Sequence, residues 1–307
     1  MKVAILDMGT NVFNLLIADV SGDNCSVIKV LKIPAKIGEG GLAKGLLMPA
    51  AFDSTREAFR EIFKTTEEFG GVEEFKAFAT SAVRGASNAQ EYLSMIKNEF
   101  GTEVEIITGN REAELIYKGV RESIILYREK VLIMDIGGGS NELIIADKDK
   151  IYWKESYDLG VVRLKELFSP SDPIKQDEVD ALTSHIEKSM STFWEACLLH
   201  KPTLLIGCSG SFDTLRELLY TQDDGSLPAY ELEMDRLTNL HQMLLKSVSR
   251  ERAGMKGMSP IRVEYIVTGS VLINYIIERT GIKDIYQSSY SLKEGYMAEI
   301  AESLNDK

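Results

Sequence analysis

Apolar residues near the start of the chain form two short runs separated by a polar turn. Val3 to Leu6 is followed by Asp7-Met8-Gly9-Thr10-Asn11, and Phe13 to Ile17 is apolar again. Runs of this length bounded by turn formers are typical of β-strands. The arrangement returns one domain length later, where an apolar run ends in Asp135 and Ile136 to Asn141 forms the turn. A repeated strand–Asp–Gly turn–strand unit indicates duplicated lobes.

Elsewhere the apolar positions recur with the spacing of amphipathic helices, and shorter apolar runs between them are typical of strands. This alternation of helix and strand patterns places the chain in the α/β class. The predicted helices cover 50–69, 88–99, 112–125, 176–199, 233–252, 265–279 and 291–304, and the further strands cover 26–33, 76–79, 104–107, 142–146, 151–153 and 203–207.

Composition and charge narrow the classes of function. A length of 307 residues suggests two domains. The formal net charge of -12 opposes binding to nucleic acids. No apolar run approaches the ~20 residues of a membrane-spanning helix, and the three cysteines lack the spacing of a disulfide framework or a zinc site. We therefore expect a cytoplasmic protein with neither a nucleic-acid nor a membrane partner.

The two glycine-rich turns carry the candidate chemistry. Asp135 is followed by Gly137, Gly138, Gly139 and Ser140. Successive glycines let backbone amides approach an anion closely, and a serine adds a hydroxyl donor. An aspartate at the strand end can hold Mg²⁺ directly or through water. The plainer alternative is a tight hairpin whose glycines satisfy only the backbone geometry.

Several motifs in a fixed order make the chain resemble a known family. The motifs are the segments 7–16, 79–84, 107–113, 135–142, 159–163, 207–211 and 291–295. In this order they resemble those of the exopolyphosphatase and guanosine pentaphosphate phosphohydrolase family, of the actin, Hsp70 and sugar-kinase superfamily, in its short two-domain form.

The resemblance implies a fold and a reaction. The fold is α/β, with two ribonuclease-H-like (actin-like) lobes, mixed sheets and an interlobe cleft. The lobes are expected at 1–120 and 121–307, with a C-terminal helix at about 291–307 packing back on the first lobe. The reaction is hydrolysis of the terminal phosphoanhydride bonds of inorganic polyphosphate, which releases orthophosphate. Guanosine pentaphosphate is the alternative substrate, and a homodimer is one expectation from relatives.

The resemblance also assigns roles to residues. Glu112 looks like the base that activates the attacking water, with Mg²⁺ as cofactor and Mn²⁺ as its substitute. Asp7, Asp135 and Glu142 are the expected metal ligands. The expected phosphate-binding residues are Gly9, Thr10, Asn11, Arg84, Gly137, Gly138, Gly139, Ser140, Ser209 and Gly210.

Plainer readings of single residues stay open at this point. Glu112 can merely complement a helix N-terminus, Glu142 can be a solvated charge at a strand edge, and Arg84 can form a surface ion pair. Ser209 stands where relatives have the first glycine of a pair, and Glu114 stands where they often have a basic residue. The alternative functions are an ATP-dependent kinase or ATPase of the same superfamily and a non-catalytic phosphate sensor.

Overall fold

The computed structural model describes residues 1–22, 24–222 and 225–305. These residues form two compact units. Unit 1 comprises Met1–Glu122 and Ser291–Lys307, and unit 2 comprises Ser123–Tyr290. Within the described ranges, no helix is both long enough and apolar enough to cross a bilayer.

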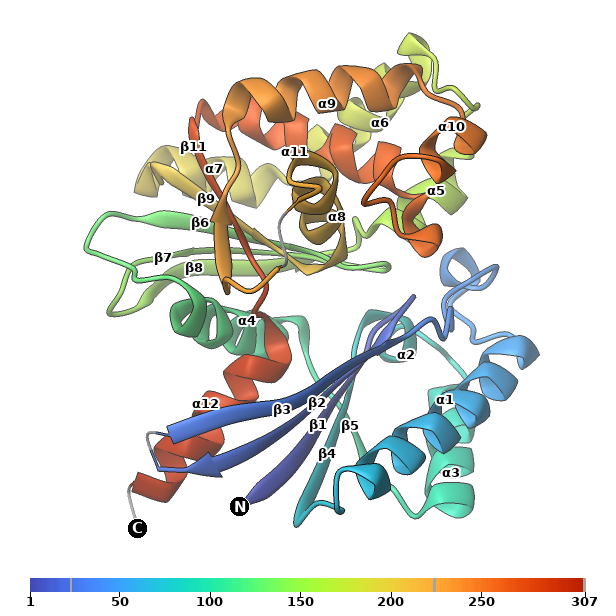
Figure 1. The fold of residues 1–307 in the computed structure, drawn as a ribbon. Helices are drawn as coiled ribbons and strands as arrows, with labels where there is room; N and C mark the ends of the chain where they lie inside the picture. The colour runs from blue at the N-terminus through green and yellow to red at the C-terminus, as the bar shows by residue number, and fades with distance from the viewer. Residues whose placement is uncertain (23, 223–224, 306–307) are drawn as a thin grey trace. The chain divides into compact units, whose positions relative to one another are not determined.

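Unit 1 is built on a five-stranded mixed sheet (Figure 1). Its core is continuous because the first two strands consist almost wholly of buried apolar residues. The first strand pairs antiparallel with the second and parallel with the fourth. In sheet order the strands are β3 (Asn24–Ile33), β2 (Phe13–Ser21), β1 (Lys2–Met8), β4 (Glu74–Ala79) and β5 (Val104–Ile106).

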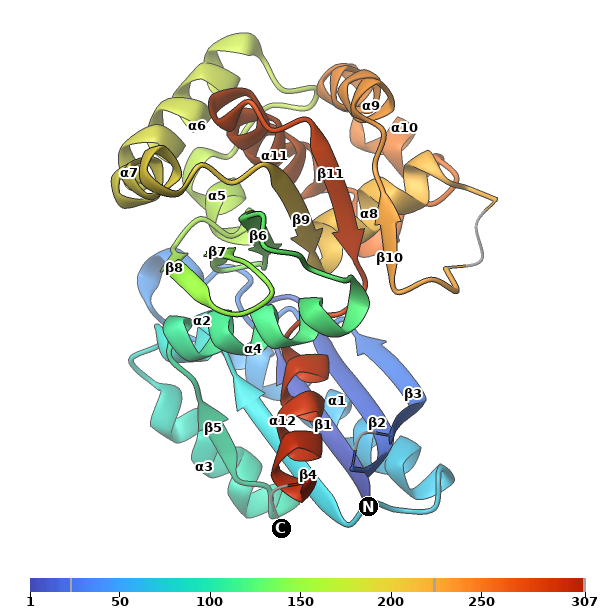
Figure 2. The same cartoon turned by 90° about the vertical axis from the view of Figure 1, so that its left-hand side faces the viewer.

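Helices cover both faces of this sheet. The two views agree that α1 (Pro49–Glu68) and α3 (Ala89–Phe100) lie on one side of it and α12 (Leu292–Asn305) on the other (Figures 1 and 2). The C-terminal helix is held there by packing of Tyr296 on Phe78, with ring centroids 4.8 Å apart. The remaining helices of the unit are η1 (Leu42–Lys44), α2 (Ser81–Arg84) and α4 (Gly109–Ser123).

Two glycines let α4 and α12 cross at backbone contact. A Cβ on Gly295 would lie 1.8 Å from the Leu115 carbonyl oxygen, and one on Gly119 would lie 2.0 Å from that of Ser291. Ion pairs join the same two helices, including Lys118 to Glu302 at 2.7 Å. The crossing fastens the end of the chain to unit 1.

We expect Gly295→Ala to destabilise the protein by ~2–3 kcal/mol, because the methyl group forces α12 away from α4. The better helix propensity of alanine offsets only ~0.5–1 kcal/mol of that loss. Chemical denaturation measures the change in the free energy of unfolding. Gly254→Ala is the control, since a Cβ there lies 3.5 Å from the nearest heavy atom. Equal stability of both variants and the parent would contradict the close crossing.

Unit 2 is built on a six-stranded mixed sheet. Two adjacent interior strands, 131–136 and 141–146, are buried along their whole length. In sheet order the strands are β10 (Ala229–Glu231), β11 (Asp284–Ser288), β9 (Leu204–Cys208), β6 (Val131–Ile136), β7 (Asn141–Ala146) and β8 (Ile151–Tyr157).

The helices of unit 2 pack on this sheet and on one another. The helix that follows β9 packs against β6, β9 and β11, and the one that precedes β9 packs against β7 and β8. The helices are α5 (Val161–Phe168), α6 (Gln176–Ser189), α7 (Ser191–His200), α8 (Ser209–Leu219), α9 (Met234–Lys246), α10 (Ser249–Ala253), η2 (Pro260–Arg262) and α11 (Ile266–Thr280).

The two sheets share one topology. In unit 1 the order is β3-β2-β1-β4-β5, and in unit 2 the strands β8-β7-β6-β9-β11 repeat it, with β10 added at the edge. In each unit the first two strands pair antiparallel. On its other side the first strand pairs in parallel, β1 with β4 and β6 with β9. The prediction of two α/β lobes with mixed sheets is therefore confirmed, and the repeated turn motif marks equivalent hairpins.

Candidate functional site

The repeated motif forms two equivalent β-hairpins, β1–β2 and β6–β7. In the first, Asp7 lies opposite Asn14, and in the second Asp135 lies opposite Glu142. Directly opposed residues of an antiparallel pair project from the same face of the sheet. Each unit therefore pairs an aspartate with a second oxygen-bearing side chain at the base of a glycine loop.

The loop of the first hairpin, residues 9–12, is tied down through its carbonyl groups. The amide of Gly38 donates to the Thr10 carbonyl at 3.0 Å, and the amide of Lys36 donates to the Asn11 carbonyl at 2.9 Å. Thr10 and Asn11 are buried, and the Asn11 side-chain nitrogen has no hydrogen-bond partner in the described structure. At the base of the loop, Asn14 donates to the Asp7 carboxylate at 3.0 Å.

Glu112 and Arg84 form an ion pair within unit 1. Arg84 ends the short helix α2, and its guanidinium donates to Glu112 Oε2 at 2.8 Å and to the Ile107 carbonyl at 2.9 Å. Glu112 is 8% exposed and lies in the first turn of α4, where the helix dipole favours a carboxylate. The surface ion pair considered for Arg84 is thus an ion pair with a buried partner. It fixes the position of the candidate base.

The loop of the second hairpin is fastened by the start of α5. The carbonyls of Gly137 and Gly138 accept from the amides of Val161 and Val162 at 3.0 and 2.8 Å, and Arg163 Nε donates to the Gly139 carbonyl at 2.9 Å. This packing is close, because a Cβ on Gly160 would lie 2.4 Å from the Gly138 carbonyl. Three successive carbonyls therefore point toward α5.

The amides of this loop point the other way. In a trans peptide the N–H is directed opposite to the carbonyl of the same plane. The N–H groups of Gly138, Gly139 and Ser140 are thus directed away from α5, and within the described residues none of them donates to a protein acceptor. All three residues are buried, and buried amides are normally paired. Three successive unpaired donors on one side of the loop are suited to bind an anion.

The two strands that flank the second loop carry two buried carboxylates. Asp135 is 6% exposed and accepts from Ser209 Oγ at 2.8 Å and from Cys208 Sγ at 3.4 Å. Glu142 is 1% exposed and accepts from Ser156 Oγ at 2.6 Å. A solvated charge at a strand edge is therefore the wrong description of Glu142. Cys208 is buried, as expected of a structural cysteine.

The donor set of unit 2 fits a hard cation. Asp135 and Glu142 offer carboxylate oxygens from opposed positions, and oxygen is the ligand atom that Mg²⁺ prefers. Within the described ranges, no three His, Cys, Asp or Glu side chains are grouped closely enough to hold a metal ion. Two carboxylates are nevertheless a usual number for Mg²⁺, which keeps several of its waters. Asp7 belongs to unit 1, where Asn14 contacts it.

Arg262 lies against the turn at Gly210. A Cβ on Gly210 would lie 1.7 Å from a guanidinium nitrogen of Arg262, so a side chain at this position would require the guanidinium to move. Burial lowers the pKa of the Arg262 guanidinium, and the carboxylates of Asp213 and Glu217 act in the opposite direction. The positive charge of Arg262 thus stands among carboxylates beside the turn.

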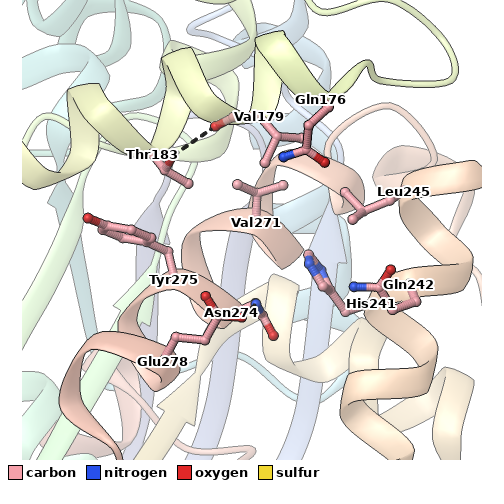
Figure 3. Close-up of a pocket in the computed structure, with 10 residues that line it drawn as sticks. All are labelled: Gln176, Val179, Thr183, His241, Gln242, Leu245, Val271, Asn274, Tyr275 and Glu278. Carbon is pink, nitrogen blue, oxygen red and sulfur yellow. Dashed lines mark hydrogen bonds between the residues drawn. The ribbon is translucent and has the colours of Figure 1, made fainter.

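The structure also has a pocket of ≈ 180 Å³ between α6, α9 and α11, and none of the residues predicted from sequence lines it (Figure 3). His241 lies in its wall, 6% exposed, with Nδ1 2.6 Å from Ser270 Oγ. Burial lowers the pKa of His241, and the negative charge of Glu278 acts in the opposite direction.

His241 is expected to make stability fall as pH is lowered. The pKa of His241 is lower in the folded state than in the unfolded state. As pH falls below ~6.5, His241 is therefore protonated in the unfolded chain before it is protonated in the folded chain. The corresponding stability is complete above that pH and is lost as pH falls toward the folded-state pKa. We expect the loss of unfolding free energy between pH 7.5 and pH 5 to be smaller in His241→Gln than in the parent. His185→Gln on α6 is the control, and an unchanged pH dependence in His241→Gln would contradict the assignment.

Some residues that hold the site together could not be predicted from a sequence pattern. Ser156, which holds Glu142, lies on the neighbouring strand, and Arg163 is occupied with the glycine loop and with Asp158, which its guanidinium meets at 3.1 Å. Nothing in the sequence spacing connects Ser156 to Glu142. Lys36 and Gly38 lie outside the helices and strands predicted from the sequence, although their amides hold the first loop.

The chain is similar in sequence and in fold to known proteins. Exopolyphosphatase 2 of Mycobacterium tuberculosis is 27% identical over 98% of this chain and 98% of its own length. The crystal structure of an exopolyphosphatase from Cytophaga hutchinsonii superposes with a TM-score of 0.95, at 34% identity and 99% coverage of both chains. The Aquifex aeolicus PPX-GPPA enzyme gives a TM-score of 0.80 at 28% identity, over 97% of this chain and 99% of that one.

The family model of the Ppx/GppA phosphatase family matches residues 16–304. That match covers nearly all of both units, including Glu112, Asp135 and Glu142. The chain therefore belongs to the Ppx/GppA phosphatase family and is a hydrolase of the phosphatase class.

Proposed function

We propose that the chain hydrolyses the terminal phosphoanhydride bonds of inorganic polyphosphate and releases orthophosphate. The observation that carries the proposal is the set of three amides at the buried residues Gly138, Gly139 and Ser140, which are unpaired within the described structure, in the loop between the strands that carry the buried carboxylates Asp135 and Glu142. Such a set of amides suits a phosphate group. Relatives named exopolyphosphatase match the chain over its whole length.

In unit 1 the proposal assigns Glu112 as the general base. Phosphoanhydride hydrolysis needs a water in line with the bond that breaks and a group that takes its proton. Glu112 Oε2 is held by Arg84, so the carboxylate has a fixed orientation. Arg84 can turn one of its remaining N–H groups to a phosphate oxygen, because a guanidinium carries five donors. Gly9, Thr10 and Asn11 are proposed to contact phosphate from their loop.

In unit 2 the proposal assigns the binding of negative charge. The amides of Gly138, Gly139 and Ser140, together with the turn at Ser209 and Gly210, are proposed to donate to phosphate oxygens, and Gly137, whose amide donates to the Ser140 carbonyl, is proposed to shape the loop. Asp135 and Glu142 would hold Mg²⁺ or Mn²⁺, and Asp7 is proposed as a metal-ligating residue of unit 1. When bound, the metal supplies positive charge that neutralises the phosphate oxygens. A local source of positive charge is needed because the chain carries a net charge of -12 and repels polyanions.

The substrate assignment has one alternative of the same chemistry. Guanosine pentaphosphate also ends in a phosphoanhydride, and the family model spans both phosphatase types by name. A cytoplasmic location and a homodimer complete the proposal. Light scattering on the purified protein measures its mass in solution. A mass equal to that of one chain would contradict the homodimer.

The test is phosphate release measured side by side on long polyphosphate, short polyphosphate, guanosine pentaphosphate and ATP, with Mg²⁺ and with chelator. We expect the highest kcat/KM on polyphosphate and loss of activity with chelator. A higher kcat/KM on guanosine pentaphosphate would select the alternative substrate. Turnover of ATP alone would instead indicate an ATPase or kinase of the wider superfamily.

A further inference from the structure

The turn between β9 and α8 holds a residue in an unusual backbone conformation. Ser209 has φ = 66°, in the left-handed region that L-residues other than Asn and Asp rarely occupy. A left-handed backbone is disfavoured for a residue with a Cβ and costs nothing for glycine. A glycine at this position would therefore adopt the turn without strain.

The two glycines of this turn are required for a different reason. A Cβ on Gly207 would lie 2.1 Å from the Phe212 ring, and one on Gly210 would meet Arg262. Neither has a positive φ. The turn thus places glycine where space is lacking and a serine where the backbone would favour glycine. The contacts of the Ser209 side chain suggest what it contributes in return for this strain.

The hydroxyl of Ser209 donates to Asp135 Oδ2 at 2.8 Å. Cys208 Sγ approaches the same oxygen at 3.4 Å, so two consecutive residues direct their side chains at one carboxylate oxygen. The contact joins β9 to the neighbouring strand β6, where Asp135 pairs with Cys208 in the parallel register. A short hydrogen bond from a neighbouring residue fixes the rotation of the carboxylate about its own axis.

We propose that Ser209 is a positioning residue that orients the Asp135 carboxylate for its cation and accepts backbone strain to do so. The proposal rests on the proposed function of Asp135 as a metal ligand. It also changes the role of the Ser209 side chain. A hydroxyl has one hydrogen, which goes to Asp135, so any donor for phosphate at this position is the backbone amide.

Two substitutions separate the effect of the Ser209 hydroxyl from the effect of the backbone strain. Ser209→Gly removes both, whereas Ser209→Ala removes the hydroxyl and keeps the Cβ in the left-handed region. We expect both to weaken Mn²⁺ binding and to lower kcat by about tenfold, the usual scale for a group that orients a metal ligand. Only Ser209→Ala is expected to melt at a lower temperature than the parent, because Ser209→Gly relaxes the backbone as it loses the bond.

Ser169→Gly is the matched control. Ser169 follows α5 with φ = 42°, and its hydroxyl donates to the Glu166 carbonyl at 3.4 Å. The same exchange at this site relaxes the same kind of strain without touching a carboxylate. We expect unchanged Mn²⁺ affinity and unchanged kcat.

Mn²⁺ affinity is measured by electron paramagnetic resonance on the protein without substrate, so the result does not depend on identifying the substrate. If the parent binds Mn²⁺ and Ser209→Gly binds it equally well, Ser209 only shapes the turn and the proposal is overturned. A loss of Mn²⁺ affinity shared by Ser169→Gly would overturn it as well. Failure of the parent to release phosphate from polyphosphate, with Mn²⁺ binding intact, counts against the proposed function and leaves the Ser209 result interpretable.

Discussion

Glu112→Gln is expected to lower kcat for phosphate release by ~10²–10⁴, the usual contribution of a positioned general base. Glutamine keeps the shape of the side chain and one acceptor oxygen for Arg84, which contacts Glu112 at 2.8 Å. It cannot take a proton from water. KM should change little, because the phosphate donors at residues 138–140 are untouched. Steady-state kinetics with polyphosphate and Mg²⁺ measure both constants.

The matched control for this variant is Glu114→Gln. Glu114 is on the same helix two residues later, its side chain is 43% exposed, and it contacts Arg111 at 3.7 Å. The exchange is chemically identical, and we expect kcat within about twofold of the parent, because surface ion pairs of this kind contribute little. Near-parental kcat in Glu112→Gln, with a melting temperature like that of the control, would remove Glu112 from the role of base.

Asp135→Asn is expected to abolish the effect of Mg²⁺ on both stability and turnover. Two opposed buried carboxylates repel each other in the absence of a cation, so the variant should be at least as stable as the parent in chelator. Mg²⁺ at 100 times its dissociation constant should stabilise the parent by ~2.7 kcal/mol and the variant not at all. We expect kcat to fall ~10²-fold or more.

Asp149→Asn is the control for the loss of a negative charge. Asp149 lies in the same unit, is 64% exposed on its side chain, and pairs with Lys148. Thermal unfolding with and without Mg²⁺ should be the same in Asp149→Asn and the parent. An Asp135→Asn protein that still gains stability from Mg²⁺ would place the metal elsewhere.

Most helices were predictable because their apolar spacing is regular and their ends carry turn residues. The helix expected at 176–199 is in fact two helices, which break at Met190. No glycine or proline marks the break, and the apolar pattern continues through it. Strand β11 was missed because its sequence, Asp-Ile-Tyr-Gln-Ser, is half polar, although Gln287 and Ser288 are fully buried. Tertiary burial overrides intrinsic preference there.

The candidate site was predictable only as far as residues adjacent in sequence define it. The glycine loops and their aspartates are local patterns, and they lie at equivalent positions in the two sheets. The contact of Arg84 with Glu112 spans 28 residues, and that of Ser209 with Asp135 spans 74. Such pairs are set by which strands become neighbours in the sheet. Sequence spacing does not contain that information.

The most direct test of the central claim is the digestion of polyphosphate whose two ends are chemically blocked, compared with polyphosphate whose ends are free. An enzyme that cleaves terminal phosphoanhydride bonds needs a free end, so we predict orthophosphate release and progressive shortening of the free chains and no cleavage of the blocked chains. Glu112→Gln should shorten the free chains ~10²–10⁴ times more slowly than the parent and should leave the blocked chains uncut. Cleavage of the blocked chains into shorter polyphosphates would contradict the account, because it would show that the parent enzyme attacks internal bonds.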